Sequence, residues 1–291
     1  MMFADYHIHT YYSDDSIYPM EQVVKDAISK GITDLCFTDH VDYGIKEDAD
    51  KLTPEQRQEL KAKIQNPNVP QYNVDYPAYV AEYQDVKEKY ADKINLKLGM
   101  EFGLQIHTIP QYQKLFNSYP FDFIIMSCHQ VDNKEFWTQE FQQGRSQDEY
   151  NQRYYDEILA QVKKYHDYSV LGHLDLIARY DKAGIYPFAK IRDKIAEILK
   201  IVIADGKGIE LNTSSVRYKI HNAQGEPELT PSREILALYK ELGGRIITTG
   251  SDSHKPEHLG AYIAEQRQEL LKLGFKEICT FEKMQPIFHK L

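Results

Sequence analysis

The chain has 291 residues, of which 42% are hydrophobic and 27% charged, and its formal net charge at pH 7 is −9. This composition is ordinary for a globular protein, and the length suits one α/β barrel, so we expect a single domain over residues 1–291. The acidic excess argues against a nucleic-acid surface, which usually needs a basic stripe. It does not exclude an anionic substrate, because bound metal ions would reverse the local field.

Cysteine is scarce, and the three thiols form no CxxC pair and no disulfide framework: Cys36, Cys128 and Cys279. Such cysteine usage is typical of a reducing compartment. No signal peptide is evident, and the longest apolar runs are too short to span a bilayer. We therefore expect a cytoplasmic protein without a membrane partner, whose oligomeric state the sequence leaves open.

Short apolar segments alternate with amphipathic ones along the chain. The first predicted strand covers residues 3–9 and the first predicted helix 19–30, where Pro19 suits the first turn and Gly31 the end. Six further strands are predicted at 32–38, 94–100, 121–127, 168–172, 208–212 and 245–249, with helices near 75–91, 148–166, 189–205, 231–242 and 260–273. This alternation predicts a mostly parallel sheet.

A barrel fits these seven strands better than a doubly wound sheet. A nucleotide-binding sheet should carry a glycine-rich turn after its first strand, but "HIHTYYSDDS" at 7–16 contains no glycine. Two long polar segments, 43–74 and 131–150, each follow a strand that ends in histidine. They are candidates for lids or specificity elements, with a solvated insertion as the alternative.

Histidines gather at the predicted strand ends. His7 and His9 are two residues apart in one strand, so both imidazoles can face the same point. Six of the eleven histidines lie at such ends, where parallel strands build active sites: His7, His9, His40, His129, His173 and His254. The others fall outside the pattern and are expected to be ordinary surface or hydrogen-bonded residues, except that His221 follows a suspected substrate loop: His107, His166, His221, His258 and His289.

Three carboxylates accompany these imidazoles. Asp15 lies in the loop after the first strand, Glu101 ends the third, and Asp252 lies two residues before His254. Zinc usually takes about four ligands, so this set suits two or three ions with bridging carboxylates. The mixture of nitrogen and oxygen donors favours Zn, Mn or Fe over Mg or Ca.

In this order, the motifs resemble the PHP superfamily, the polymerase and histidinol phosphatase domain. Its four motifs match "DYHIHT", "FTDH", "GHLD" and "GSDSH", and its intervening glutamate and histidine match Glu101 and His129. The resemblance covers nearly the whole chain. Three segments resemble the histidinol-phosphate phosphatase branch in particular: "GHLDLIARY" at 172–180, "IELNTSSVRY" at 209–218 and "PELTPSREIL" at 227–236.

The resemblance implies a distorted (β/α)7 barrel, TIM-barrel-like, with three divalent metal ions. Many members carry histidine where this chain has Asp15, a harder ligand that could shift metal preference, and Asp14 is the alternative at one residue's offset. By position, the ligands of the three ions would be His7, His9, Glu101 and Asp252; Glu101, His129 and His173; and Asp15, His40 and His254.

The implied activity is hydrolysis of L-histidinol phosphate to L-histidinol and phosphate, a step of histidine biosynthesis. A metal-bridging hydroxide would attack phosphorus, because metal-bound water can lose a proton near neutral pH. The leaving alkoxide needs a proton, for which Asp252, with His254 beside it, or a metal-bound water is the candidate. No GxSxG elbow supports a serine triad.

Substrate contacts are predicted after the strand ends. Arg179 and Arg217 are candidate phosphate clamps, because a guanidinium matches phosphate with a planar fork of donors. Asp132 or Asp42 could meet the amine of the substrate. Cys128 neighbours His129 but alternates to the other face, which predicts core packing rather than a nucleophile.

Two other functions remain open. The chain could be another phosphoesterase of this superfamily, acting on a nucleotide, a different small phosphate ester or a phosphotyrosyl protein. It could also be a degenerate domain that keeps metals only for folding or interaction. The retained set of nine ligand-type residues argues against the degenerate domain.

Overall fold

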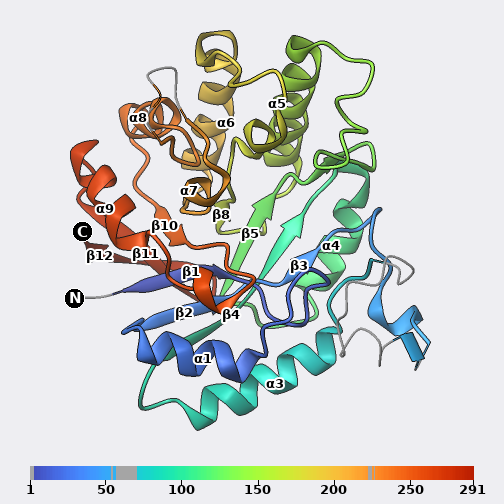
Figure 1. Ribbon diagram of the computed structural model, residues 1–291, viewed down its shortest axis with the longest axis vertical. Helices are drawn as coiled ribbons and strands as arrows, with labels where there is room; N and C mark the ends of the chain where they lie inside the picture. Colours follow the sequence, from blue (N-terminus) through green and yellow to red (C-terminus); the bar gives the residue numbers. More distant parts are fainter. Residues whose placement is uncertain (1–2, 54, 57–70, 222–224, 226) are drawn as a thin grey trace.

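The computed structural model describes residues 3–53, 55–56, 71–221, 225 and 227–291. Its main sheet is parallel and has the order β1-β2-β4-β5-β8-β9-β10, with the short strand β3 also paired to β4 (Figure 1). The strands are β1 Ala4–Ile8, β2 Asp34–Phe37, β3 His40–Val41, β4 Asn95–Gly103, β5 Phe123–Ser127, β8 Val170–Leu171, β9 Gly208–Asn212 and β10 Ile247–Gly250. All seven predicted strands are confirmed, with ends that shift by up to three residues.

The first and last strands of this sheet meet, so the sheet nearly closes into a barrel. The backbone nitrogen of His9 donates to the carbonyl of Ser253 at 2.8 Å, and the nitrogen of Ser253 donates to the carbonyl of His7 at 3.3 Å. Thr249 Oγ1, in β10, donates to the carbonyl of Ala4 in β1 at 3.2 Å. The predicted (β/α)7 barrel is therefore confirmed.

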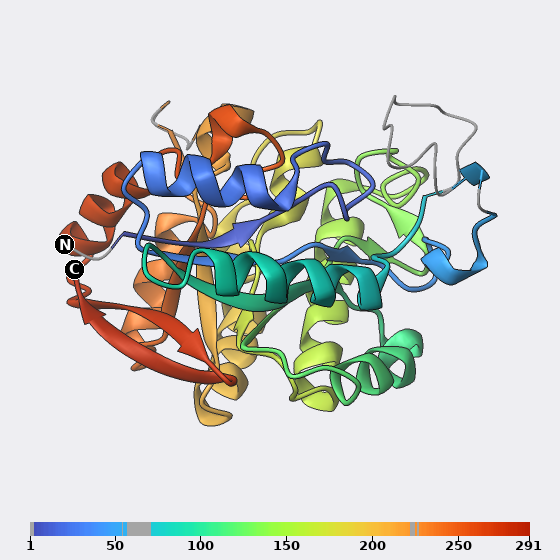
Figure 2. The same cartoon turned by 90° about the horizontal axis from the view of Figure 1, so that it is seen from below.

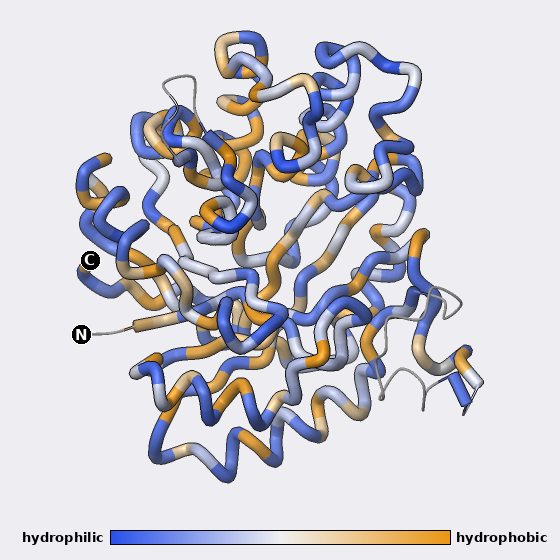
Figure 3. The backbone as a smooth tube through the Cα atoms, viewed as in Figure 1, coloured by the Kyte–Doolittle hydropathy of each residue, from blue (hydrophilic) through white to orange (hydrophobic). Residues whose placement is uncertain are grey.

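Helices surround the sheet, and each predicted helix is found. In α1, the side chains of Met20, Val23, Val24 and Ala27 are buried in the core. α1 and α3 lie side by side along the same part of the sheet (Figures 1 and 2), and orange alternates with blue along both in Figure 3, as expected of helices with one apolar side. The helices are α1 Met20–Ser29, α3 Tyr76–Lys89, α4 Ile109–Phe116, α5 Gln147–Lys164, α6 Arg192–Ala204, α7 Ser215–Tyr218, α8 Arg233–Glu241 and α9 Ile263–Lys272.

Several elements were not predicted, among them the helices α4 and α7 and the short strand β3. Another is the short hairpin β6 Gln130–Val131 with β7 Lys134–Glu135, which gives the polar segment 131–150 an ordered start. A further one is the C-terminal antiparallel hairpin of β11 Glu277–Glu282 and β12 Gln285–Lys290, near the chain ends in Figure 2. It packs on the barrel, where Tyr6 in β1 accepts from the nitrogen of Phe281 at 3.1 Å.

The segment 43–74 lies partly outside the described residues. Its described part includes the 3-10 helix η1, Ala49–Lys51. It also brings Lys46 and Asn73 to the end of β3, where Asn73 Oδ1 accepts from the nitrogen of Asp42 at 2.8 Å. Among the described residues, no helix is long and apolar enough to cross a membrane.

Candidate metal centre

The structure brings all nine predicted ligands into one network at the carboxyl ends of the strands. Glu101, at the end of β4, is fully buried and lies at its centre. Burial alone would raise the pKa of this carboxyl, but the surrounding imidazoles, those of His7, His129 and His40 foremost, hold it well below its usual range. Carboxylate oxygens of Glu101 lie within 3.5 Å of nitrogens of five imidazoles, those of His7, His9, His40, His129 and His173.

Four buried nitrogen and oxygen atoms of this network, each able to bind a metal ion, form no hydrogen bond among the described residues. His7 Nε2 and His40 Nδ1 lie 3.1 and 3.0 Å from Glu101 Oε2, and His9 Nε2 lies 3.5 Å from it. All four of these atoms are buried and unpartnered. Unsatisfied buried polar atoms are costly, and a metal ion would take up their lone pairs. The residues present therefore fit metal ions.

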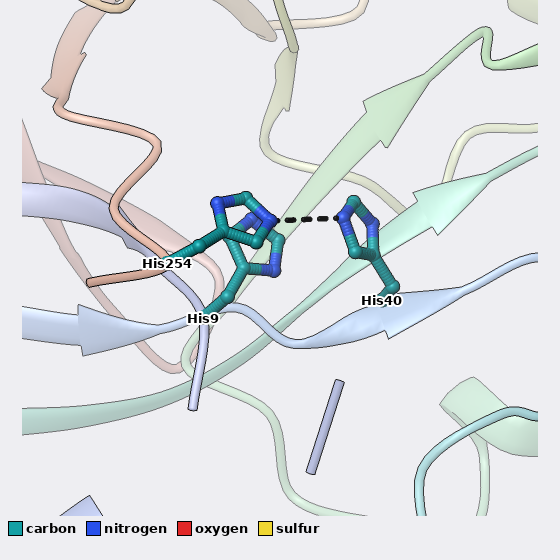
Figure 4. Close-up of side chains that lie close together, drawn as sticks. All are labelled: His9, His40 and His254. Carbon is teal, nitrogen blue, oxygen red and sulfur yellow. Dashed lines mark hydrogen bonds between the residues drawn. The ribbon is translucent and has the colours of Figure 1, made fainter. Parts of the chain in front are cut away.

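The imidazoles of His9, His40 and His254 stack around one point (Figure 4). The ring centroid of His9 lies 4.1 Å from that of His40 and 4.0 Å from that of His254. His40 Nε2 and His254 Nε2 are 3.5 Å apart. Burial, together with the neighbouring His254 and His40, holds the pKa of His9 well below its usual value. His9 is therefore neutral, which is the form of imidazole that binds metals.

Asp15, rather than Asp14, joins this group of imidazoles. Asp15 Oδ2 lies 3.1 Å from His254 Nε2 and 3.5 Å from His40 Nε2. Asp14 Oδ1 instead pairs with Lys46 Nζ at 2.8 Å. The geometry thus favours the predicted Asp15 as the ligand, because the carboxylate of Asp14 already has a cationic partner.

Two carboxylates that the sequence did not indicate contact the Nδ1 atoms of ligand imidazoles. Glu210 Oε1, in β9, lies 2.6 Å from His7 Nδ1, and Asp42 Oδ1 lies 2.8 Å from His129 Nδ1. Asp42, predicted as one of two possible amine contacts, lines the cleft and is buried beside His129, with Oδ2 3.0 Å from Lys46 Nζ. The alternation of strand residues could have indicated both carboxylates, because residues two apart point to the same face: Glu210 with Asn212, and Asp42 with His40.

A cleft of about 430 Å³ lies over the cluster, and both predicted arginines line it. The guanidinium of Arg179 lies 4.0 Å from the ring centroid of Tyr218. It donates to Ser214 Oγ at 2.6 Å and lies 3.6 Å from Asp252 Oδ2. Among the described residues its Nε is buried and has no partner. This stacked, partly unpaired guanidinium suits anion binding.

Arg217 has different partners. Its Nη1 and Nη2 each donate at 2.8 Å, to the backbone carbonyls of Ser251 and Asp252. It therefore holds the loop after β10 in place, besides lining the cleft.

Asp132 does not belong to the cleft, so its predicted contact with the substrate is not supported by the structure. It lies at the tip of the β6–β7 hairpin, where Asp132 and Asn133 have φ angles of 53° and 57°. This tight turn points the carboxylate outward, where it is 61% exposed and pairs with Arg153 at 3.2 Å. Trp137, farther along the same segment, does line the cleft. Cys128 is buried in the core, as predicted.

Three of the five remaining histidines have ordinary partners. His107 contacts Asn133 at 3.0 Å, His166 contacts Asp205 at 2.8 Å, and His289 contacts Thr280 at 2.6 Å. His221 is exposed and lies on a different cavity. His258 lies on the lining of the cleft, a position that sequence spacing did not indicate.

Known proteins resemble this chain over its whole length. A histidinol-phosphatase of Lactococcus lactis subsp. lactis is 29% identical, covering 97% of this chain and 95% of the relative. A probable histidinol-phosphatase of Thermotoga maritima is 28% identical, with coverages of 95% and 94%. The crystal structure of histidinol phosphate phosphatase from Lactococcus lactis, complexed with zinc, L-histidinol and phosphate, matches with a TM-score of 0.80 and 28% identity, covering 98% of each chain.

The family comparison agrees with the arrangement of the ligands. The PHP domain family matches residues 5–214, which include the strands from β1 to β9 and most of the ligand cluster. Since this match covers well over half of the chain, the protein belongs to the PHP domain family.

Proposed function

We propose that the protein is a metal-dependent phosphomonoesterase that hydrolyses L-histidinol phosphate to L-histidinol and phosphate in histidine biosynthesis. The observation that carries the proposal is the position of Arg179, which lines the cleft over the ligand cluster and lies 3.6 Å from Asp252. The names of the similar proteins support the choice of substrate. One domain over residues 1–291 in the cytoplasm fits this role, and the three cysteines are unpaired and buried.

We further propose that the nine ligands hold three ions of Zn, Mn or Fe, in the three sets given above, with Glu101 shared. When bound, such ions would polarise the phosphoryl oxygens and supply an activated water. The protein contributes fixed donors. Glu210 and Asp42 hold Nδ1 of His7 and His129, so that each Nε2 stays directed at the centre.

Residues that line the cleft would bind the phosphate group and assist the leaving group. Arg179 would bind a phosphate oxygen through its free Nε, because stacking on Tyr218 and the bond to Ser214 fix its plane. Among the catalytic candidates, burial would raise the pKa of Asp252, but His7, His9 and His254 hold it well below its usual range. Asp252 is therefore a poor acid. His254 would hold an ion through Nε2, and its Nδ1 lies 3.1 Å from the backbone carbonyl of Asp252, so the proton for the leaving alkoxide would come from a water molecule.

The test is phosphate release from a panel of esters by metal-loaded protein. The panel holds histidinol phosphate, p-nitrophenyl phosphate, a nucleotide and a phosphotyrosyl peptide, each assayed with added Zn, Mn or Fe and again after chelation. We expect histidinol phosphate to be hydrolysed far faster than the others, and activity to disappear with the chelator. Slow and even hydrolysis of all four would keep the metal-dependent phosphoesterase but reject this substrate.

A further inference from the structure

A second cavity lies beside the metal centre, lined by residues of α5, of the 3-10 helix η3 (Leu176–Tyr180) and of the start of α8. Its volume is about 710 Å³, and its walls are largely apolar, with Ile177, Phe188 and Ile235 among them. Small-molecule sites have such sizes and are mostly apolar, with a few polar groups that fix orientation. Among the described residues, no lining residue is shared with the cleft over the ligand cluster.

The cavity contains polar groups that the protein does not satisfy. Tyr155 is 2% exposed and Thr230 is 4% exposed. Neither side-chain hydroxyl has a hydrogen-bond partner in the described part of the chain, although both residues line the cavity. Asp175 also lines it: Oδ2 accepts from the nitrogen of Ser232 at 2.7 Å, whereas Oδ1 is buried and unpartnered within the described ranges. Buried polar atoms normally have partners, so a ligand that offers donors would complete this site.

The charges around the cavity favour a cation. Asp175, Glu228 and Glu234 line it, and His221 lies exposed at its edge. Arg233 also lines it, but its Nη1 pairs with Glu228 at 3.0 Å and its Nη2 with Glu269 at 3.1 Å. Among the described residues, Asp175 forms no ion pair within 4.0 Å, and burial raises its pKa to about 7, so a bound cation would stabilise the charged form of this carboxyl.

We propose that this cavity binds a small organic ammonium ion with an apolar or aromatic body. The ammonium group would donate to Asp175 Oδ1 and to the hydroxyls of Tyr155 and Thr230. The apolar body would pack between Ile177 and Phe188. The site does not depend on which ester the metal centre hydrolyses.

The position of the cavity connects it to the candidate phosphate site. Ile177 and Ala178 of η3 line the cavity, whereas Arg179 and Tyr180 of the same short helix line the cleft. A ligand in the cavity would therefore restrain the helix that carries Arg179. Because coupling between two binding sites is reciprocal, the ammonium ion and phosphate should each change the affinity of the other.

The test uses the metal-loaded full chain and three probes that share a phenyl group: 2-phenylethylamine, 2-phenylethanol and 3-phenylpropionate. Binding is measured by calorimetry in the presence of inorganic phosphate, and the variants below assign it to the cavity or to the metal centre. We expect the ammonium ion to bind about tenfold or more tightly than the alcohol, and the carboxylate to bind most weakly. Equal affinities, or no binding of the amine at millimolar concentration, would overturn the proposal.

Two variants and one spectroscopic measurement locate the binding. Asp175→Asn should abolish the preference for the amine over the alcohol, and Tyr155→Phe, which removes one oxygen atom, should weaken amine binding severalfold. Glu88→Gln, on the exposed side of α3, is the matched control. Methyl NMR should show shifts at Ile177 and Ile235 when the amine binds. Shifts confined to other isoleucines, or unchanged amine binding in Tyr155→Phe, would place the amine elsewhere and reject the site.

The coupling has its own measurement. The affinity of the metal-loaded protein for inorganic phosphate is determined with and without saturating 2-phenylethylamine. A changed phosphate affinity is expected, and in Tyr155→Phe the same change should require a severalfold higher amine concentration. An unchanged affinity with the amine bound would reject the link through η3.

Discussion

His7 Nδ1 lies 2.6 Å from Glu210 Oε1, and both side chains are buried. This contact joins β1 to β9 and leaves His7 Nε2 directed at Glu101 Oε2, 3.1 Å away. Burial alone would lower the pKa of His7, but the charges of Glu210, Glu101 and Asp252 together raise it well above its usual value. Glu210 thus sets both the orientation and the basicity of the imidazole, which are the two properties that a metal ligand needs.

Glu210→Gln should weaken metal binding without unfolding the barrel. The amide keeps the shape of the side chain but removes the charge that favours His7 as a ligand, so metal affinity should fall about 10- to 100-fold. Metal retained after dialysis against metal buffers measures the loss, and excess metal should restore much of the activity. Glu88→Gln is the exposed control. Metal retention equal to that of the unmodified protein would show that Glu210 has no such role.

Glu101→Ala should abolish activity, because this carboxylate contacts five imidazoles at the centre of the cluster. We expect a loss larger than the roughly 100-fold typical of residues that only support a ligand. His9→Ala should behave alike. Circular dichroism should show a folded barrel in both variants. Full activity in either one would remove the metal-centre interpretation.

The sequence allowed prediction of those site residues whose side chains can bind metal and which lie at the ends of strands. His7, His9 and Glu101 could be predicted because parallel strands direct their carboxyl ends to one place. Glu210 was missed because one acidic residue in an apolar strand does not reveal which imidazole it faces. Asp132 is 61% exposed at the β6–β7 turn, whose positive φ angles are not encoded by a glycine, and its substrate contact stays a prediction.

The β1 strand shows a further limit of sequence patterns. Asp5 pairs with Leu35 and Ile8 with Phe37, so one extra residue in β1 forms a bulge beside His7. Simple alternation does not hold across such a bulge, which re-aims side chains next to functional sites. The shared direction of His7 and His9 therefore depends on contacts with Glu210 and Ser13, at 2.6 and 3.2 Å, as well as on strand period.

Lys46→Met should destabilise the protein strongly. Lys46 Nζ lies 2.8 Å from Asp14 and 3.0 Å from Asp42, and the lysine side chain is 6% exposed. Removing the ammonium leaves Asp14 without its cation and the buried Asp42 with the imidazole of His129 as its remaining partner, which costs about 3–5 kcal/mol for a buried pair. Urea unfolding of metal-loaded protein measures the change.

Lys51→Met is the matched control, because Lys51 is 62% exposed and its contact with Glu47 is 3.4 Å long. Such a surface pair contributes less than about 1 kcal/mol. Equal effects of the two substitutions would show that Lys46 is not an essential counter-ion.

Glu135 should make stability depend on pH. Burial, with a smaller effect of the Asp42 charge, raises its pKa from 4.5 to about 7. The folded state therefore holds this proton more tightly than the unfolded state, and the associated stability is present below pH 4.5 and lost as pH rises through 7. In Glu135→Gln this loss is removed, so the variant should gain about 2–3 kcal/mol relative to the unmodified protein between pH 5 and 8.

Urea unfolding of both proteins at pH 5 and pH 8 gives this difference directly. Glu140→Gln, an exposed position on the same segment, controls for the general effect of removing a carboxylate. A stability difference that is the same at both pH values would mean that Glu135 titrates normally.

Arg179→Ala should weaken phosphate binding more than it slows the chemical step. The guanidinium stacks on Tyr218 and donates to Ser214, so its orientation is fixed before substrate arrives. A charged hydrogen bond to phosphate contributes about 1.5–3 kcal/mol, which corresponds to a loss of about 10- to 150-fold in kcat/KM. Inhibition by inorganic phosphate should weaken by a similar factor, because product and substrate share this contact. Arg179→Lys should recover little, since a single ammonium neither stacks on Tyr218 nor presents a planar fork. An unchanged kcat/KM in Arg179→Ala, with unchanged phosphate inhibition, would leave the orientation of the phosphoryl group to the metal centre alone.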